Sequence, residues 1–350
     1  MKGAPEQRRQ VMTREVDVRW VYNNFHVGVL IVDTRTRDLI MVNTPIGAIH
    51  IPPQTESTIQ TMDAIEQRLD DSHRMIFSKP KRFLREVVLI GDDPAGWMQC
   101  LQTLLVDEGV VASVSILVDS FDAFAQRYPF YTEAHCVAPS TAGPRVTYPN
   151  EIEDRFLYLG NLWQAESKQV IRDLGITHVV NATLDLDNVF EGHGVRYHVV
   201  KIPDHADADI SSYFDSTFAF IEHARSLQSP HKHHRVLVHC TQGISRSATL
   251  VIMYLMRAHR WSLVTAFNHT HRSRPVIIPN KGFFRALMED EQRLFDGRSS
   301  LDETEIDALL QGRVGDHEPT SRPRTCTNEV RSRRHVLHAT SHASDRCLTM

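Results

Sequence analysis

Residues 236–247 bring a cysteine and an arginine to a spacing that suits phosphate chemistry. The stretch reads Val-Leu-Val-His-Cys-Thr-Gln-Gly-Ile-Ser-Arg-Ser, with β-forming residues before Cys240 and a long apolar helical pattern from Arg246 onward. A loop between a strand and a helix turns its backbone N–H groups inward, at the positive end of the helix dipole. The stretch therefore predicts a binding site for an oxyanion that requires no metal.

Cys240 is the predicted nucleophile of this loop, and Arg246 is its predicted anion-binding side chain. Backbone N–H donors, a helix N-terminus and a guanidinium all favour the thiolate over the thiol. The planar fork of Arg246 suits two equatorial oxygens of a phosphoryl group. Ser247 is expected to hydrogen-bond the thiolate, and His239 is expected to orient the loop from behind. The residues expected to bind the phosphoryl group are Thr241, Gln242, Gly243, Ile244, Ser245 and Arg246.

The stretch resembles the signature of the cysteine-dependent protein phosphatases, in which His-Cys is followed by five residues, Arg, and then Ser or Thr. The Ser-Arg-Ser ending and the following Ala-Thr-Leu are similar to the dual-specificity branch. The resemblance extends from the strand at 156–162 to about Phe295 and includes the segment from Arg274 to Asn280. It implies hydrolysis of phosphotyrosine, phosphoserine or phosphothreonine through a cysteinyl-phosphate intermediate, without metal or organic cofactor.

The leaving oxygen needs a general acid, and the loop after Ile202 offers Asp204, Asp207 and Asp209. Counted back from the helix opening at 211–214, Asp204 falls where the acid of the family falls, and Ile-Pro-Asp resembles the Trp-Pro-Asp of tyrosine phosphatases. Asp209 is better explained as an N-cap residue. Asp204 is therefore the predicted acid, and Asp207 is the alternative.

The elements that must position these groups alternate between strand and helix, which predicts an α/β fold. In the second half of the chain we expect strands at 156–162, 176–181 and 194–202, a helix at 164–174, and a catalytic domain spanning 150–297. In the first half we expect a parallel sheet within 13–135, with strands at 27–33, 46–52, 86–91 and 114–118 and helices at 15–23 and 97–108.

The first half resembles a rhodanese-like domain in Leu-Ile-Val-Asp-Thr-Arg, in Gly-Ala-Ile-His-Ile-Pro and in the segment 121–129. Rhodaneses carry a sulfur-transferring cysteine after the strand that ends here at Gly91, but this loop reads Asp-Asp-Pro-Ala-Gly. Without that thiol, the domain is expected to be non-catalytic and a sulfurtransferase is disfavoured. Cys100 is interpreted as a buried structural thiol.

An inactive rhodanese-like domain before a dual-specificity phosphatase domain resembles the MAP kinase phosphatases, whose first domain binds the kinase through arginines. The candidates here are Arg82 and Arg85 with Lys79 and Lys81, and a solvated helix entry is the favoured alternative. The expected partner is a phosphoprotein substrate, with a MAP kinase docked on the first domain as the specific hypothesis. Relatives with this domain pair include pseudophosphatases, so a scaffold that binds phosphoproteins is the competing function.

The rim residues Thr241, Gln242 and Ile244 are neutral, whereas phosphoinositide and RNA phosphatases of the superfamily often carry basic residues there. A phosphoprotein substrate is therefore favoured, and the choice between phosphotyrosine and phosphothreonine stays open. The net charge of −4 gives no basic excess for nucleic acid. The histidines in 231–234 are expected in an exposed loop, although two imidazoles there are also an alternative metal site.

The remaining segments indicate the cellular location and the places where the domains end. Five scattered cysteines indicate a reducing compartment, and the sequence shows no membrane-spanning run and no signal peptide, so cytoplasmic or nuclear residence is expected. Three prolines within 136–149 predict a linker. Residues 298–350 are predicted to be a largely disordered basic tail, with one short helix at 300–310 that is capped by Ser300 and Glu303.

Overall fold

The computed structural model describes residues 10–25, 28–53, 61–93, 96–133, 146–297 and 299–310. Their strands form two five-stranded sheets and a small ribbon of β3 (Thr44–Pro45) with β7 (Thr132–Glu133). Both large sheets lie within one compact unit of the chain. The α/β class expected from the sequence is confirmed. The predicted linker lies outside the described residues as far as residue 145, and so does the predicted tail apart from residues 299–310.

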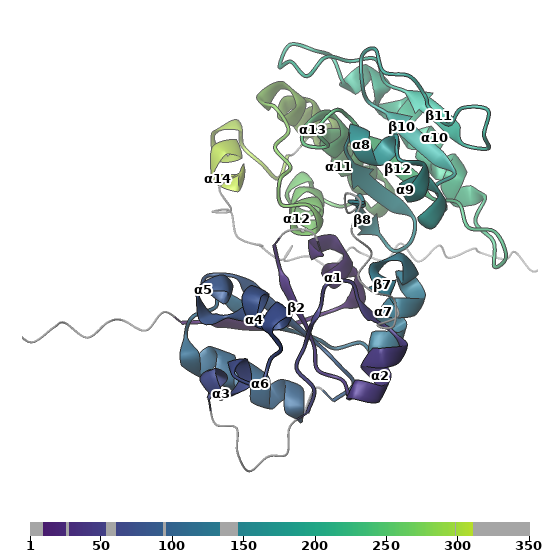
Figure 1. The fold of residues 1–350 in the computed structure, drawn as a ribbon. Helices are drawn as coiled ribbons and strands as arrows, with labels where there is room; N and C mark the ends of the chain where they lie inside the picture. Colours follow the sequence, from purple (N-terminus) through teal and green to yellow (C-terminus); the bar gives the residue numbers. More distant parts are fainter. Residues whose placement is uncertain are drawn as a thin grey trace, which may run out of the picture. The chain divides into compact units, whose positions relative to one another are not determined.

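The first sheet belongs to the N-terminal part of the chain and is parallel throughout (Figure 1). Its strands, in spatial order, are β1 (Met12–Val16), β6 (Ser113–Leu117), β5 (Glu86–Ile90), β2 (Leu30–Asp33) and β4 (Ile49–His50). Parallel neighbours need crossover connections, and these connections place helices over the faces of the sheet. These helices are α1 (Val18–Asn24), α2 (Arg37–Val42), α3 (Met62–Glu66), α4 (Asp71–Phe77), α5 (Lys79–Arg82), α6 (Trp97–Glu108) and α7 (Phe121–Arg127).

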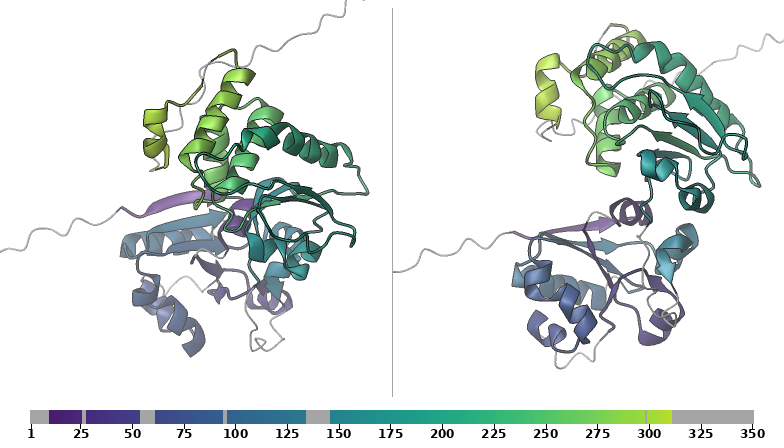
Figure 2. Two further views of the ribbon diagram at one scale, coloured as in Figure 1. Left: turned by 90° about the horizontal axis from the view of Figure 1, so that it is seen from above. Right: turned by 45° about the horizontal axis from the view of Figure 1, so that its top comes forward.

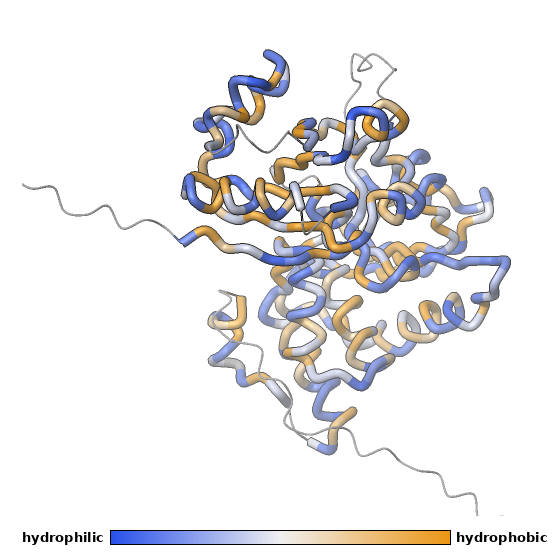
Figure 3. The backbone as a smooth tube through the Cα atoms, turned by 90° about the horizontal axis from the view of Figure 1, so that it is seen from below, coloured by the Kyte–Doolittle hydropathy of each residue, from blue (hydrophilic) through white to orange (hydrophobic). Residues whose placement is uncertain are grey.

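Alternation of side chains along the strands divides the buried residues between two cores. In β5, Val87 and Leu89 belong to one cluster, whereas Val88 and Ile90 belong to the other, because successive side chains of a strand point to opposite faces. Hydrophobic and hydrophilic residues alternate along the helices as well (Figure 3), as expected of helices that bury one side. Both faces of this sheet are therefore covered.

The second sheet contains the phosphate-binding loop predicted from the sequence. Its strands, in spatial order, are β11 (Arg196–Val199), β10 (His178–Asn181), β12 (Val236–His239), β9 (Leu157–Gly160) and β8 (Asn150–Glu153). All pairs are parallel except the edge pair of β8 with β9, which is antiparallel. The helices of this part, which Figure 2 shows from two further sides, are α8 (Leu162–Ala165), α9 (Lys168–Asp173), α10 (Phe214–Ser226), α11 (Arg246–His259), α12 (Leu263–Ser273), α13 (Lys281–Leu294) and α14 (Ile306–Leu310).

One apolar core is shared by the two sheets. Leu237 of β12 and Val170 of α9 belong to the same cluster of buried residues as Val88 of β5. Within this cluster Tyr22 of α1 stacks on Tyr128, with the ring centroids 4.3 Å apart. The other face of the second sheet packs separately against α10, α11, α12 and α13. No helix among the described residues is long and apolar enough to cross a lipid bilayer.

Two predicted helices have different boundaries in the structure. The segment 15–23 holds the end of β1 and most of α1, whose first turn is capped by Asp17 accepting a hydrogen bond from the Trp20 N–H at 2.7 Å. The predicted helix 164–174 is two short helices, α8 and α9, and Ser167 caps the second by accepting from the Val170 N–H. In both places a side-chain N-cap starts a new helix inside a segment whose sequence pattern predicts one continuous helix.

Two further expectations are wrong. Cys100 is exposed on α6 and is not a buried thiol. The C-terminal capping box is formed by Asp302 and Glu305 around a single 3₁₀ turn (Glu303–Glu305), not by Ser300 and Glu303. Ser300 instead donates its backbone N–H to Glu291 of α13 at 2.7 Å.

Arg82, which was a candidate for kinase docking, is fully buried. Its guanidinium donates to the Glu108 carboxylate at 2.6 and 2.9 Å and to the Phe77 carbonyl at 2.7 Å, and it also pairs with Glu66. Arg85 donates to the Gly28 carbonyl at 2.8 Å. Arg82 therefore holds α3, α4, α5 and α6 together and is not available to a partner surface.

Replacing Arg82 with Ala should lower the free energy of unfolding by about 3 kcal/mol. It leaves the mostly buried Glu66 carboxylate without its counter-charge and leaves Glu108 with only the exposed Lys79 at 3.8 Å. Chemical denaturation of the two proteins measures the difference. Lys81→Ala, which removes an exposed cation of the same helix, should change the value by less than about 0.5 kcal/mol. Equal effects of the two variants would contradict a supporting role for Arg82.

Candidate active site

The loop 240–246 lies between the central strand β12 and the helix α11. β12 is flanked by β10 and β9, and all four of its residues are buried. α11 buries every residue from Ser247 to Met256, so its first turn is fixed against the sheet. The N-cap residue Ser245 makes no side-chain cap bond to this helix. The Ser245 side chain therefore does not compete with the Cys240 sulfur or with a bound anion for the first N–H groups of α11.

Cys240 lies at the centre of this loop and is 1% exposed. Its Sγ accepts hydrogen bonds from the Gly243 N–H at 3.1 Å and from the Ser247 hydroxyl at 3.2 Å. Burial by itself raises the pKa of the thiol, but the hydrogen bonds from Ser247 and from the Ile244 N–H, with the charge of Arg246, bring the pKa below its ordinary value. The geometry therefore favours a thiolate at the sulfur.

Gly243 makes the turn of the loop with a φ of +71°. A Cβ at this position would lie 2.4 Å from the Gly160 carbonyl oxygen, which is backbone and cannot move aside easily. Residue 243 must therefore be glycine on two grounds, the left-handed conformation and the close approach to β9.

Arg246 spans the space between the loop and the end of β11. Its guanidinium donates to the Thr241 hydroxyl at 3.2 Å and to the Ile202 carbonyl at 3.3 Å. Its Nε lies 3.5 Å from an oxygen of Asp204 and has no hydrogen-bond partner among the described residues. These long contacts leave donors for the oxygens of a phosphoryl group.

Asp204 is the acidic residue that the structure brings to the loop. One of its carboxylate oxygens accepts from the Ser245 hydroxyl at 2.8 Å and from the side-chain amide of Asn280 at 2.9 Å. The backbone N–H of Asn280 donates in turn to the Ser245 hydroxyl at 3.2 Å. Asp204 is thus tied both to the phosphate-binding loop and to the start of α13.

The other two carboxyl groups of that segment have different surroundings. Asp207 is exposed and lies 3.4 Å from His205. Asp209 accepts from the Ser212 N–H at 3.3 Å. The predicted N-cap role is one residue off, because the N-cap residue of the 3₁₀ turn Ser211–Tyr213 is Ile210. The segment itself lies tightly on α13, because a Cβ at Gly282 would lie 1.8 Å from the Ala206 carbonyl oxygen.

His239 is 3% exposed behind the loop. Burial lowers the pKa of its imidazole to about 4, and the nearby charge of Arg246 acts in the same direction. A hydrogen bond with the backbone of Cys240 opposes this shift but does not reverse it. The side chain is therefore neutral near pH 7 and lies where it can orient the loop backbone.

Two residues that we did not assign from the sequence hold the loop from outside. Arg274 donates to the carbonyl oxygens of Gly243 at 2.8 Å and Gln242 at 3.2 Å, and Asn280 contacts Ser245 and Asp204 as described above. Both belong to the segment after α12 that was recognised only as part of the family resemblance. The sequence signal available was one arginine before a proline and one asparagine after a proline, and neither indicates a contact with a distant loop.

The rim of the loop is neutral, as its sequence indicates. Thr241 and Gln242 are exposed and Ile244 is partly buried. The Thr241 carbonyl accepts from the Leu162 N–H at 3.2 Å, and the Ile244 carbonyl accepts from the Ile278 N–H at 3.0 Å. The flanking segments thus fix the rim through its backbone and leave its side chains to face a substrate.

The histidines of 231–234 do not form a metal site among the residues that the structure describes. His231 and His233 are exposed, whereas His234 is buried against the His178 ring, with the centroids 5.5 Å apart. Within the described ranges, the set of three acidic, histidine or cysteine side chains that lie close enough to share an ion is Asp63, Glu66 and Glu108. Two of these three carboxylates already bind Arg82.

Replacing Ser247 with Ala should raise the pKa of the Cys240 thiol by about one unit, because a hydrogen bond to a charged group is worth about 1.5 kcal/mol. The thiolate then forms at higher pH, so the pH midpoint of alkylation by iodoacetamide moves upward. Mass spectrometry of the peptide that contains Cys240 measures the rate. Ser226→Ala serves as the control, because it removes an exposed hydroxyl of α10 that donates to the His223 carbonyl. An unchanged midpoint in Ser247→Ala would contradict the assigned contact.

Comparison with known proteins agrees with this geometry. Residues 157–293 match the family model described as dual specificity phosphatase, catalytic domain. Dual specificity protein phosphatase 1 of Homo sapiens is 39% identical over 139 residues, which cover 40% of this chain and 36% of that protein. Dual specificity protein phosphatase 4 of Homo sapiens is 32% identical over 201 residues, which cover 52% and 50%. Protein phosphatase Slingshot homolog of Xenopus laevis is 37% identical over 139 residues, which cover 40% and 19%. The chain thus spans half or less of the length of these relatives. The matched residues 157–293 include Cys240, Arg246 and Asp204, so the segment that carries the candidate site is the one similar to a dual specificity phosphatase catalytic domain.

Proposed function

We propose that this chain is a protein phosphatase that hydrolyses phosphotyrosine, phosphoserine or phosphothreonine through a cysteinyl-phosphate. The observation that carries the proposal is the set of donors on the buried Cys240 sulfur, with Arg246 and Asp204 3.5 Å apart beside it. A thiolate, an anion-binding fork and a carboxyl group are the three parts that phosphoryl transfer without a metal requires.

In the first step the Cys240 thiolate attacks the phosphorus in line with the leaving oxygen. A sulfur–phosphorus bond forms while the phosphorus–oxygen bond to the substrate side chain breaks. The carboxyl group of Asp204 transfers its proton to the departing oxygen, so that a neutral hydroxyl leaves. Arg246 and the loop N–H groups hold the equatorial oxygens as their charge increases.

In the second step a water molecule attacks the cysteinyl-phosphate. The Asp204 carboxylate takes a proton from that water, the sulfur–phosphorus bond breaks, and inorganic phosphate and the thiolate are released. Ser247 donates its hydrogen bond to the sulfur as charge returns to it, which makes the sulfur a better leaving group. His239 is proposed to orient the loop without exchanging protons.

A phosphoprotein is the proposed substrate. The rim residues are neutral, and the flanking side chains Trp163, Val276 and Ile278 are exposed and apolar. A neutral, apolar rim of this kind suits a peptide. A binding site for a densely charged inositol phosphate or for RNA would be expected to carry basic side chains. We also propose that residues 150–297 form the catalytic domain and that the protein resides in the cytoplasm or the nucleus.

The first half, 13–135, is proposed to be a non-catalytic rhodanese-like domain. Support comes from its parallel sheet, and from the exposed Asp92 and Asp93 where a sulfurtransferase would carry a thiol. Docking of a MAP kinase on this half remains a proposal based on resemblance. Because Arg82 is buried in an internal network, such docking must use other groups.

Cys240→Ser should abolish hydrolysis of an aryl phosphate in the presence of a metal chelator, and Arg246→Lys should reduce kcat/KM by about 10² or more, because an ammonium cannot replace the planar fork. Steady-state rates of the purified chain measure both. Circular dichroism should show that each variant is folded. Equal, negligible rates for the wild type and Cys240→Ser would replace the phosphatase with a scaffold that binds phosphoproteins.

Asp204→Asn should lower kcat by about 10² for aryl phosphates of weakly acidic phenols, and much less for those of strongly acidic phenols, because the latter leave without a proton. Gly282→Ala should act in the same direction, since its methyl group displaces the segment that carries Asp204. Lys281→Ala is the matched control on the same helix. If Asp207→Asn, and not Asp204→Asn, shows the dependence on the leaving group, the acid is Asp207.

A further inference from the structure

Arg274 is a second, partly buried guanidinium beside the loop 240–246. It is held from one side by Asn150 of β8, whose side-chain oxygen accepts from Nη1 at 2.7 Å. On the other side its Nε and Nη2 donate to the carbonyls of Gly243 and Gln242. All three nitrogens of the fork therefore have a partner, and none of these bonds is to a carboxylate.

The two carbonyls that Arg274 binds belong to the peptide groups whose N–H bonds reach Cys240. A trans peptide points its C=O and its N–H in opposite directions. The peptide joining Gln242 to Gly243 has its carbonyl on Arg274 and its N–H on the Cys240 sulfur. The next peptide likewise has the Gly243 carbonyl on Arg274, while the Ile244 N–H is hydrogen-bonded to Cys240.

Arg274 thus binds the carbonyl oxygens of the two peptide groups whose N–H groups donate to the thiolate. If its fork were absent, each of these peptides would be free to rotate, and a rotated peptide would turn a carbonyl toward the sulfur. The charge of Arg274 is also felt by Cys240: burial lowers the pKa of Arg274, and the negative charge on the sulfur opposes that shift.

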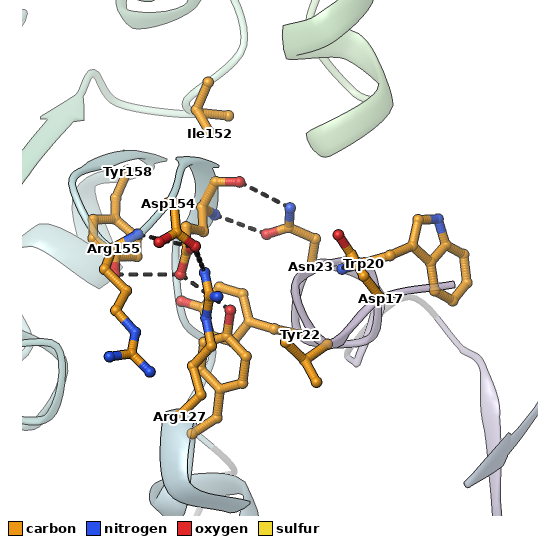
Figure 4. A network of polar contacts seen from close by, with 12 residues as sticks. Asp17, Trp20, Tyr22, Asn23, Arg127, Ile152, Asp154, Arg155 and Tyr158 are labelled. Carbon is orange, nitrogen blue, oxygen red and sulfur yellow. Dashed lines mark hydrogen bonds and ion pairs between the residues drawn. The ribbon is translucent and has the colours of Figure 1, made fainter. Parts of the chain in front are cut away.

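Asn150 connects this arrangement to the N-terminal sheet. Its side-chain nitrogen donates to the Ser273 carbonyl at 2.8 Å and to the Asn23 carbonyl at 3.0 Å. The Asn23 carbonyl lies in the last turn of α1, where carbonyls have no partner within the helix. The Asn23 side chain pairs with the backbone of Glu151 through both its atoms, at 2.7 and 2.9 Å (Figure 4).

We propose that Arg274 is a positioning residue for Cys240, and that Asn150 and Asn23 extend its support to the N-terminal half of the chain. In this arrangement α1 holds β8, Asn150 holds the guanidinium, and the guanidinium holds two peptides with their N–H groups on the sulfur. The N-terminal half then contributes to the acidity of the nucleophile and to the affinity of the loop for a phosphoryl group. The inference deepens the proposed function.

The test reads the thiol without any substrate, so its failure is distinct from a failure of the proposed activity. Arg274→Lys and Asn150→Ala should each raise the pH midpoint of Cys240 alkylation by iodoacetamide, by about one unit for Arg274→Lys. Arg274→Lys should also weaken the binding of inorganic phosphate to the full chain by about tenfold, since two loop peptides lose their orientation. Calorimetry measures that binding.

Thermal unfolding separates positioning from mere stability. If Arg274→Lys and Asn150→Ala lower the melting temperature but leave the alkylation midpoint unchanged, both residues are only structural and the proposal is overturned. Asn24→Ala is the matched control for α1, because its side-chain amide donates within that helix, to the Trp20 carbonyl at 2.8 Å.

Asn23→Ala tests the link to the N-terminal half. It should raise the midpoint in the same direction as Asn150→Ala, and the double variant should raise it by less than the sum of the two single shifts. If Asn23→Ala matches Asn24→Ala in both midpoint and phosphate affinity, or if the shifts of Asn23→Ala and Asn150→Ala add, the proposed link between the two halves is overturned.

Discussion

Hydrogen bonding to one buried sulfur atom is the interaction on which the candidate site of this chain depends. Cys240 is almost completely removed from water, and an ionised group in such a place is strongly disfavoured unless it is solvated by the protein. The donors that replace water are backbone N–H groups of the loop and the hydroxyl of Ser247. Because backbone donors cannot reorient individually, the charge on the sulfur requires that the whole loop be held in one conformation.

That requirement explains features that are otherwise unrelated. β12 is buried along its whole length and α11 along ten consecutive residues, so both ends of the loop are immobile. Gly243 allows the loop to approach β9 more closely than any side chain permits. Arg274 binds the loop carbonyls from the opposite side. The fold thus holds the donors in place before any phosphate arrives, which is how electrostatic stabilisation avoids reorganisation during reaction.

The sequence was most informative where a function resides in one short segment. Cys240, Arg246 and Ser247 lie within eight consecutive residues, and a strand and a helix around them set their geometry. The contact of Arg274 with the loop could not be predicted from the sequence. Arg274 reaches the loop only after α11 and α12 have reversed the direction of the chain, and no local sequence pattern indicates that reversal. Strand β1 was not predicted, and its last two residues were assigned to the helix at 15–23. It is an edge strand with one buried residue in five, so the periodicity of burial is absent. Cys100 lies two positions after the buried Met98, about 200° around the helix, and it therefore faces solvent.

The shared core gives the N-terminal half a role that does not depend on recruiting a partner. Glu151 of β8 is fully buried, and its carboxylate is neutralised by Arg127 and hydrogen-bonded by the Tyr128 hydroxyl at 3.1 Å, both from the N-terminal half. A buried carboxylate without such partners would be strongly destabilising. The same strand carries the neighbouring residue Asn150, which binds Arg274 and so supports the loop. The position of β8 is therefore set by both halves of the chain, and the C-terminal half separated from the N-terminal half would lose the counter-charge of Glu151 on the strand that also carries Asn150.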